Sequence, residues 1–132
     1  MLRPVRPRFV AVLLVAASLS GCGAGPSDTE QVQAAVEAFG RATAAKDYQG
    51  LCDRLLAPDL VQEVEEAGLP CEVALRQGLG DVQAPTLTIG AIKVDDDKAT
   101  AEVNSAAQGQ PPSRDTLQLE RVGDTWRIAS LR

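Results

Sequence analysis

The hydrophobic periodicity of the chain changes once, around Gly78, Gly80 and Pro85. Before these residues, apolar side chains recur at three- and four-residue spacing, which is typical of amphipathic helices. After them, apolar and polar residues alternate, which is typical of strands with one buried face. Helices that are all followed by strands indicate an α+β domain. We therefore predict N-terminal helices packed on a curved four-stranded antiparallel sheet.

Four helices are expected before the change of period. Ser27 and Glu30 match a capping box, in which each side chain accepts a hydrogen bond from the other residue's backbone, and they predict the start of the first helix. Asp47 can cap a second, short helix. Two further helices are expected at residues 58–67 and 71–79, because glycine and proline residues separate these segments.

The strands are marked by apolar residues at a period of two. In the first strand Gly90 interrupts this alternation and Ile92 resumes it on the opposite phase, which predicts a bulge that curves the sheet. Residues 122–125 favour a hairpin between the last two strands. The apolar positions of the last three strands are Ala99, Ala101 and Val103, then Leu117 and Leu119, then Trp126 and Ile128.

The first residues of the chain match an export signal. Arg3, Arg6 and Arg8 form a basic start, and the apolar run at residues 9–19 contains a single polar residue. As a helix this run would reach only about 16 Å, roughly half of what a membrane-spanning helix needs. We therefore predict a signal peptide at residues 1–21 rather than a permanent transmembrane helix.

The sequence Leu19-Ser20-Gly21-Cys22 follows this run and resembles the lipobox of bacterial lipoproteins. The resemblance implies that Cys22 becomes a lipid-modified N-terminus, that residues 22–27 are a flexible tether, and that residues 28–132 form one domain. The protein would then be anchored in the membrane, at the outer face of the bacterial cytoplasmic membrane. The alternative is an ordinary signal peptide with a chance cysteine at the cleavage site.

Cys52 and Cys71 are the two cysteines that remain if Cys22 carries lipid. An even number of cysteines in an exported chain favours a disulfide. Closure of a loop of this size would stabilise the fold by about 3 kcal/mol. A pair of free buried thiols is the alternative, and the absence of a C-x-x-C motif argues against a redox-active pair.

The charged residues exclude several classes of function. The chain has no histidine, which excludes His-dependent zinc sites, catalytic triads and imidazole acid/base chemistry. It has 13 basic and 18 acidic residues, and the signal peptide holds three of the basic ones. We therefore expect no binding to nucleic acid.

Two acidic runs invite a metal assignment. They are Glu63, Glu65 and Glu66, and Asp95, Asp96 and Asp97. The second run lacks the alternating ligands, the glycine and the distant glutamate of an EF-hand loop. We interpret the first run as a solvated helix face and the second as a solvated turn, and we predict no metal site and no cofactor.

Three segments resemble the nuclear transport factor 2-like (NTF2-like) superfamily. They are the opening helix around Phe39 that leads to Tyr48, residues 55–59, and residues 119–128 with Trp126. The resemblance covers roughly residues 28–132, and small actinobacterial lipoproteins of this superfamily also tend to contain a cysteine pair. It implies that the predicted helices and the curved four-stranded sheet form a cystatin-like α+β roll.

The superfamily includes ketosteroid isomerase-like and polyketide cyclase-like enzymes, whose pocket holds an acid/base carboxylate and donors such as tyrosine. In this chain Tyr48, Phe39 and Trp126 are expected to pack in the core rather than to bind a ligand. No Asp or Glu falls clearly on the core-facing strand positions, so we assign no catalytic residue. An enzyme would require Glu102 or Asp115 to turn inward.

Three hypotheses of function remain. The leading one is a non-enzymatic, lipid-anchored domain that binds a small apolar ligand or another envelope protein. The small residues Ala99 and Ala101 could leave room for a ligand pocket, but we favour the interpretation that they let a helix pack closely. The second hypothesis is the enzyme described above, and the third is a structural or regulatory partner of a membrane complex, which would expose an apolar patch.

Overall fold

The structure, a computed structural model, describes residues 25–131 of the 132-residue chain. The predicted signal peptide and Cys22 lie outside the described residues. The elements are α1 (Asp28–Ala44), α2 (Tyr48–Gly50), the π-helical turn η1 (Leu51–Leu55), α3 (Pro58–Glu66), α4 (Cys71–Leu79), β1 (Thr86–Asp95), β2 (Lys98–Ala106), β3 (Ser113–Val122) and β4 (Thr125–Leu131).

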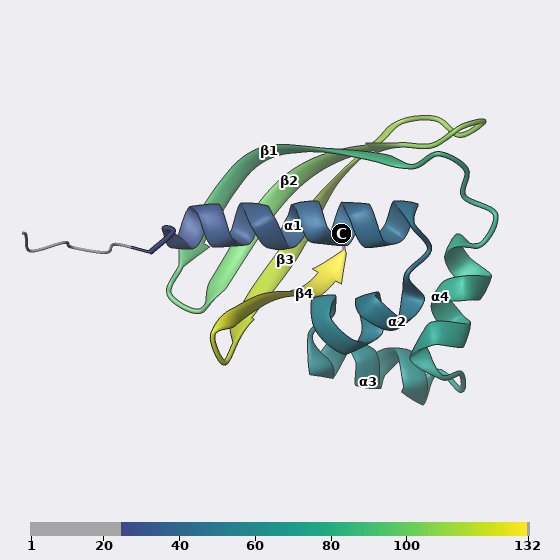
Figure 1. Cartoon of the computed structure of the whole chain (residues 1–132), viewed down its shortest axis with the longest axis horizontal. Coiled ribbons are helices and arrows are strands. Elements are labelled where there is room, and N and C mark those ends of the chain that lie inside the picture. Colours follow the sequence, from purple (N-terminus) through teal and green to yellow (C-terminus); the bar gives the residue numbers. More distant parts are fainter. Residues whose placement is uncertain (1–24, 132) are drawn as a thin grey trace, which may run out of the picture.

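The four strands form one antiparallel sheet in the order β1-β2-β3-β4, so each strand pairs with its neighbour in sequence. The sheet curves around α1, which lies across its inner face, while α2, α3 and α4 lie at one end (Figure 1). This arrangement confirms the predicted α+β class with a curved four-stranded antiparallel sheet. None of the described helices is both long and apolar enough to cross a membrane.

Two bulges set which side chains face α1. In β1 the register jumps between the pairs Ile89–Val103 and Ile92–Ala101, which confirms the bulge predicted at Gly90. A second, unpredicted jump lies between β3 and β4, where Gln118 pairs with Ser130 but Leu119 pairs with Ile128. Because partners across a ladder share a face, the extra residue at position 129 brings Leu131 to the same face as Leu117.

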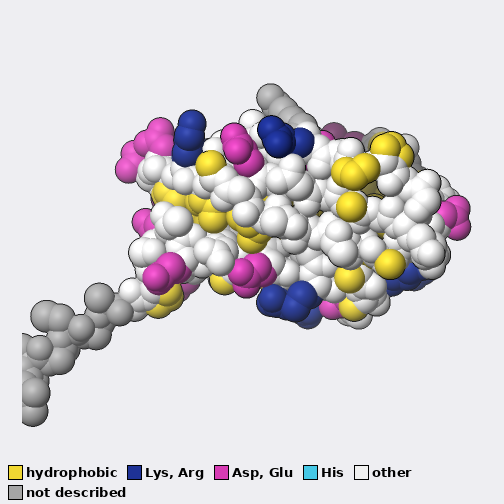
Figure 2. All heavy atoms as spheres, turned by 90° about the horizontal axis from the view of Figure 1, so that it is seen from above, with side chains coloured by type: hydrophobic (Ala, Val, Ile, Leu, Met, Phe, Trp, Pro, Cys, Tyr) yellow, Lys and Arg dark blue, Asp and Glu magenta, His cyan; other side chains and the backbone are white. Residues whose placement is uncertain are grey.

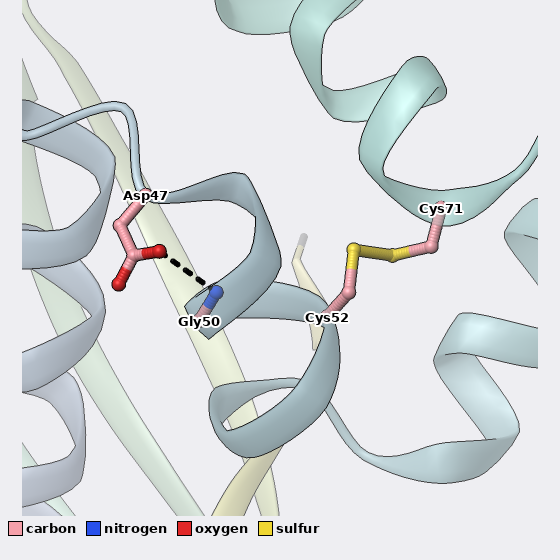
Figure 3. Close-up of a disulfide and its surroundings, with 4 residues drawn as sticks. All are labelled: Asp47, Gly50, Cys52 and Cys71. Carbon is pink, nitrogen blue, oxygen red and sulfur yellow. Dashed lines mark hydrogen bonds between the residues drawn. A yellow bond between two sulfur atoms is a disulfide. The ribbon is translucent and has the colours of Figure 1, made fainter.

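The helix boundaries follow from the predicted caps. Ser27 Oγ accepts a hydrogen bond from the Glu30 amide at 3.2 Å, and the Ser27 amide donates to the Glu30 carboxylate at 3.0 Å. Asp47 accepts a hydrogen bond from the Gly50 amide at 2.9 Å (Figure 3). The second helix does not continue as an α-helix, because the Leu56 amide donates to the Leu51 carbonyl, a π-type bond that closes η1.

The core lies between α1 and the inner face of the sheet. Val32 and Val36 of α1 are fully buried and belong to one cluster with Ala99 and Ala101 of β2. The two alanines thus let the helix approach the sheet closely and do not line a pocket. Trp126 is buried in the same cluster, whereas Phe39 is only partly buried and faces a cavity.

Candidate functional site: an apolar cavity with one carboxylate

A cavity of about 440 Å³ lies between the C-terminal part of α1, the helix α4 and the open end of the sheet. This volume is within the range of pockets that bind small molecules. Each surrounding element contributes apolar side chains, among them Phe39 of α1, Leu75 of α4, Leu87 of β1, Val103 of β2 and Leu117 of β3. Phe39 therefore forms part of a wall, which corrects the expectation that it packs only in the core.

The helices at this end bury few side chains against the sheet. Helix α3 has no fully buried residue, and in α4 only Cys71 is fully buried. Helix α4 presents the small residues Ala74 and Gly78 to the cavity. Small side chains on α4 and a curved sheet below it leave a volume that no core residue fills.

The disulfide secures this wall of the cavity. Cys52 of η1 and Cys71 at the start of α4 are bonded, with their Cα atoms 6.1 Å apart (Figure 3). Cys71 is 4% exposed. The predicted pair thus joins α4 to the turn that precedes α3. Because α4 makes few buried apolar contacts, this covalent bond helps to hold it in place.

Among residues 25–131, one carboxylate lines the cavity, and it belongs to Asp115 of β3. The expectation that no acidic residue faces inward is therefore wrong for this residue. Asp115 lies two residues before Leu117 and four before Leu119, both of which are buried, so all three point to the inner face. The period-two alternation that puts residues 115, 117 and 119 on one face is visible in the sequence. It is apolar only from Leu117 onwards, however, whereas the strand itself begins at Ser113.

Two serines surround this carboxylate. Ser113 Oγ donates to Asp115 Oδ2 at 2.7 Å, and Ser105 Oγ lies 3.5 Å from the same oxygen. The two serine oxygens are 2.8 Å apart, and both residues line the cavity. No sequence pattern marks Ser105 or Ser113 as functional, since serine at the end of a strand is also common in plain loops.

Other residues considered for chemistry lie elsewhere. Glu102 is exposed on the outer face of β2, where it lies beside Gly90. Tyr48 is buried, does not line the cavity, and its hydroxyl has no hydrogen-bond partner among the described residues. The structure therefore does not place Tyr48 and Asp115 in one pocket.

The acidic runs take different positions. Asp96 has a positive φ of 50° in the turn between β1 and β2, and Asp97 lies 3.7 Å from Arg121. Residues 63, 65 and 66 are exposed on α3. Across residues 25–131, no group of three or more Cys, Asp or Glu side chains is arranged to hold a metal ion.

Charges of both signs are mixed on the surface. On the face that Figure 2 shows, Lys and Arg side chains alternate with Asp and Glu, and hydrophobic side chains reach the surface between them. A nucleic-acid-binding surface instead gathers basic residues on one face or along one helix. This face offers no such patch.

No protein-family model matches the chain, and no curated protein matches it. Several solved structures do match the chain. An NTF2-like protein of unknown function from Silicibacter pomeroyi matches with a TM-score of 0.54 and 17% identity, covering 76% of this chain and 89% of that one. A candidate dehydratase of the NTF2-like family from Streptomyces avermitilis matches with a TM-score of 0.54 and 21% identity, covering 77% and 91%.

A de novo designed protein with a curved β-sheet also matches, with a TM-score of 0.56 and 17% identity, and covers 76% of this chain and 96% of that one. Similarity to natural NTF2-like proteins and to a design made around a curved sheet shows that the chain has the NTF2-like fold. Proteins of this fold include both ligand-binding and enzymatic members, so the fold alone does not define a function.

Proposed function

We propose that this chain is a lipid-anchored protein of the cell envelope whose roll binds a small, largely apolar molecule in the cavity. The observation that carries the proposal is the cavity itself, with its volume of about 440 Å³ and its walls of aliphatic and aromatic side chains. Enclosing an apolar ligand there removes apolar surface of both ligand and protein from water, which favours binding.

The placement of the cavity fits an anchored protein. Helix α1 begins where the proposed tether ends, and it runs from that end of the molecule towards the end where α2 and α4 lie (Figure 1). The cavity is lined by the C-terminal part of α1, so it lies at the far end from the tether. If Cys22 is lipid-modified, the tether would join the domain at the end opposite the cavity, so the anchor itself would not cover the cavity.

A small ligand explains the described surface better than a protein partner does. Among the described residues, the large hydrophobic side chain that is strongly exposed is Leu131, at 57%. Leu131 itself lines the cavity. A docking surface for a protein partner would instead expose a contiguous apolar patch.

A cavity-filling substitution tests this function. In full-length protein, Ala74→Phe places an aromatic ring in the α4 wall, and we expect it to abolish the fluorescence increase of the neutral apolar probe N-phenyl-1-naphthylamine. The matched control is Gln77→Phe, which adds the same ring to an exposed position of α4 outside the cavity wall. Equal probe binding by the native protein and both variants would show that the probe does not use the cavity.

A second candidate is an acid/base enzyme, and Asp115 favours it. A carboxylate in an apolar cavity can act as a general base, and one solved structure of similar fold is a candidate dehydratase. The elimination of 5-nitrobenzisoxazole is a direct test, because a base that removes its carbon-bound proton breaks the N–O bond and releases a coloured phenolate. Turnover that Asp115→Asn removes would favour the enzyme, whereas binding without turnover would favour the binding protein.

A further inference from the structure

We propose that the cavity selects amphipathic molecules whose apolar body carries a terminal cationic amine, which Asp115 binds. This inference rests on the proposed function and deepens it by naming the class of ligand. It follows from three features of the Asp115 environment: its hydrogen bonds, the charges that surround it, and the apolar character of the remaining wall.

The hydrogen bonds of Asp115 leave acceptor capacity unused. Ser113 has one hydroxyl hydrogen, which it donates to Asp115 Oδ2 at 2.7 Å. The 2.8 Å bond between the two serines must then be donated by Ser105, so Ser105 has no hydrogen left for the carboxylate. Within residues 25–131, Asp115 Oδ1 accepts no side-chain hydrogen bond, although a carboxylate can accept about four.

The negative charge of Asp115 is also uncompensated. None of the residues that line the cavity is a lysine or an arginine, and no described residue forms an ion pair with Asp115. The neighbouring Arg114 is exposed and donates instead to Asn104 at 3.3 Å. A partly buried carboxylate with neutral partners is stabilised by a cation and destabilised by a second anion.

These features set the shape of the preferred ligand. Val103 is the cross-strand partner of Asp115, and Leu117 follows it on the same face, so the carboxylate borders an apolar floor. A molecule with an apolar body and one ammonium group satisfies both parts of this surface. A fatty acid with the same chain length as the amine would fill the same volume. Its carboxylate, however, would either lie next to the carboxylate of Asp115 or remain outside the cavity.

The experiment compares three ligands with the same alkyl chain: decylamine, decanol and decanoate. Each displaces N-phenyl-1-naphthylamine from full-length protein in phosphatidylcholine vesicles at neutral pH, and the Ala74→Phe protein in the same vesicles corrects for partition into lipid. We expect decylamine to act at a ten- to hundredfold lower concentration than decanoate, the range expected for a hydrogen bond to a charged group, with decanol between them.

Two variants assign this preference to one carboxylate. Asp115→Asn keeps the shape of the side chain and should remove the difference between amine and acid while leaving the affinity for decanol within about twofold. Glu102→Gln removes one negative charge from the outer face of the neighbouring strand and should leave the preference unchanged.

The outcomes separate the inference from the proposed function. Decanoate that binds as tightly as decylamine, or an amine preference that survives Asp115→Asn, would overturn the inference while the cavity remains a binding site. Failure of all three ligands to displace a bound probe would also overturn it. Probe binding that Ala74→Phe leaves unchanged would overturn the proposed function itself.

Discussion

Arg121 Nη2 lies 2.6 Å from Asp28 Oδ1, although 93 residues separate them in sequence. Asp28 is the first residue of α1, and the same guanidinium lies over the Trp126 ring, 4.7 Å from its centre. Arg121 therefore joins the start of α1 to the hairpin between β3 and β4. This contact fixes the end of the domain from which the proposed tether leaves.

We expect Arg121→Ala to lower the free energy of unfolding by about 1 to 2 kcal/mol. Both charged partners are partly exposed, so the ion pair contributes at most about 1 kcal/mol, and the cation–π contact contributes a similar amount. Urea unfolding measures the loss. Arg114→Ala, on the outer face of the same strand, is the control and should change stability by less than about 0.5 kcal/mol; equal losses in the two variants would contradict the assigned role.

The Cys52–Cys71 bond should matter more for α4 than for any other helix. Replacing both cysteines by alanine should cost about 3 kcal/mol of stability, because the unfolded chain loses a constraint. Cys71 is the buried residue of α4, so amide hydrogen exchange should rise first in α4, and binding of N-phenyl-1-naphthylamine should weaken with it. Unchanged exchange in α4 would show that side-chain packing alone holds this wall.

Much of the fold can be predicted from local patterns. The capping box at Ser27 and Glu30 and the bulge at Gly90 are set by neighbouring residues, so the sequence displays them directly. The π-turn η1 and the bulge near residue 129 lie where distant segments meet. Just after η1, the Ala57 amide donates a hydrogen bond to the Ile128 carbonyl, and no local pattern predicts this contact.

The cavity is harder to predict than the core, because a cavity is defined by what does not fill it. Periodicity identifies which faces are apolar, but not whether two apolar faces meet. Asp115 shows the same difficulty, since the apolar pattern of β3 starts at Leu117, and only the observed strand start extends the inward face back to the carboxylate. The alanines Ala99 and Ala101, which could have lined a pocket, instead lie under α1.

The lipid anchor is a prediction about Cys22, which lies outside the described residues. Cys22→Ala should move the protein from the detergent-rich phase to the aqueous phase in a detergent phase-partitioning experiment, because it removes the thiol that would carry lipid. Cys52→Ala and Cys71→Ala together form the matched control and should leave partitioning unchanged. A Cys22→Ala protein that has lost residues 1–21 and still stays in the detergent-rich phase would contradict the anchor.

Ala84 has a positive φ of 45° in the segment that leads from α4 to β1, immediately before Pro85. This left-handed conformation costs a residue with a Cβ atom about 1 to 2 kcal/mol, and glycine avoids that cost. Glycine also gains entropy in the unfolded chain, which offsets part of this benefit. We therefore expect Ala84→Gly to stabilise the fold by a net amount of about 0.5 to 1 kcal/mol in thermal unfolding.

The control for this prediction is Ala45→Gly, at the C-cap of α1. Ala45 is also exposed, but its φ of −80° is ordinary for alanine. Glycine there removes no strain and adds only unfolded-state entropy, so Ala45→Gly should destabilise the fold by about 0.5 to 1 kcal/mol. The two alanine-to-glycine changes should thus shift the melting temperature in opposite directions. If Ala84→Gly instead lowers the melting temperature as Ala45→Gly does, Ala84 carries no net strain.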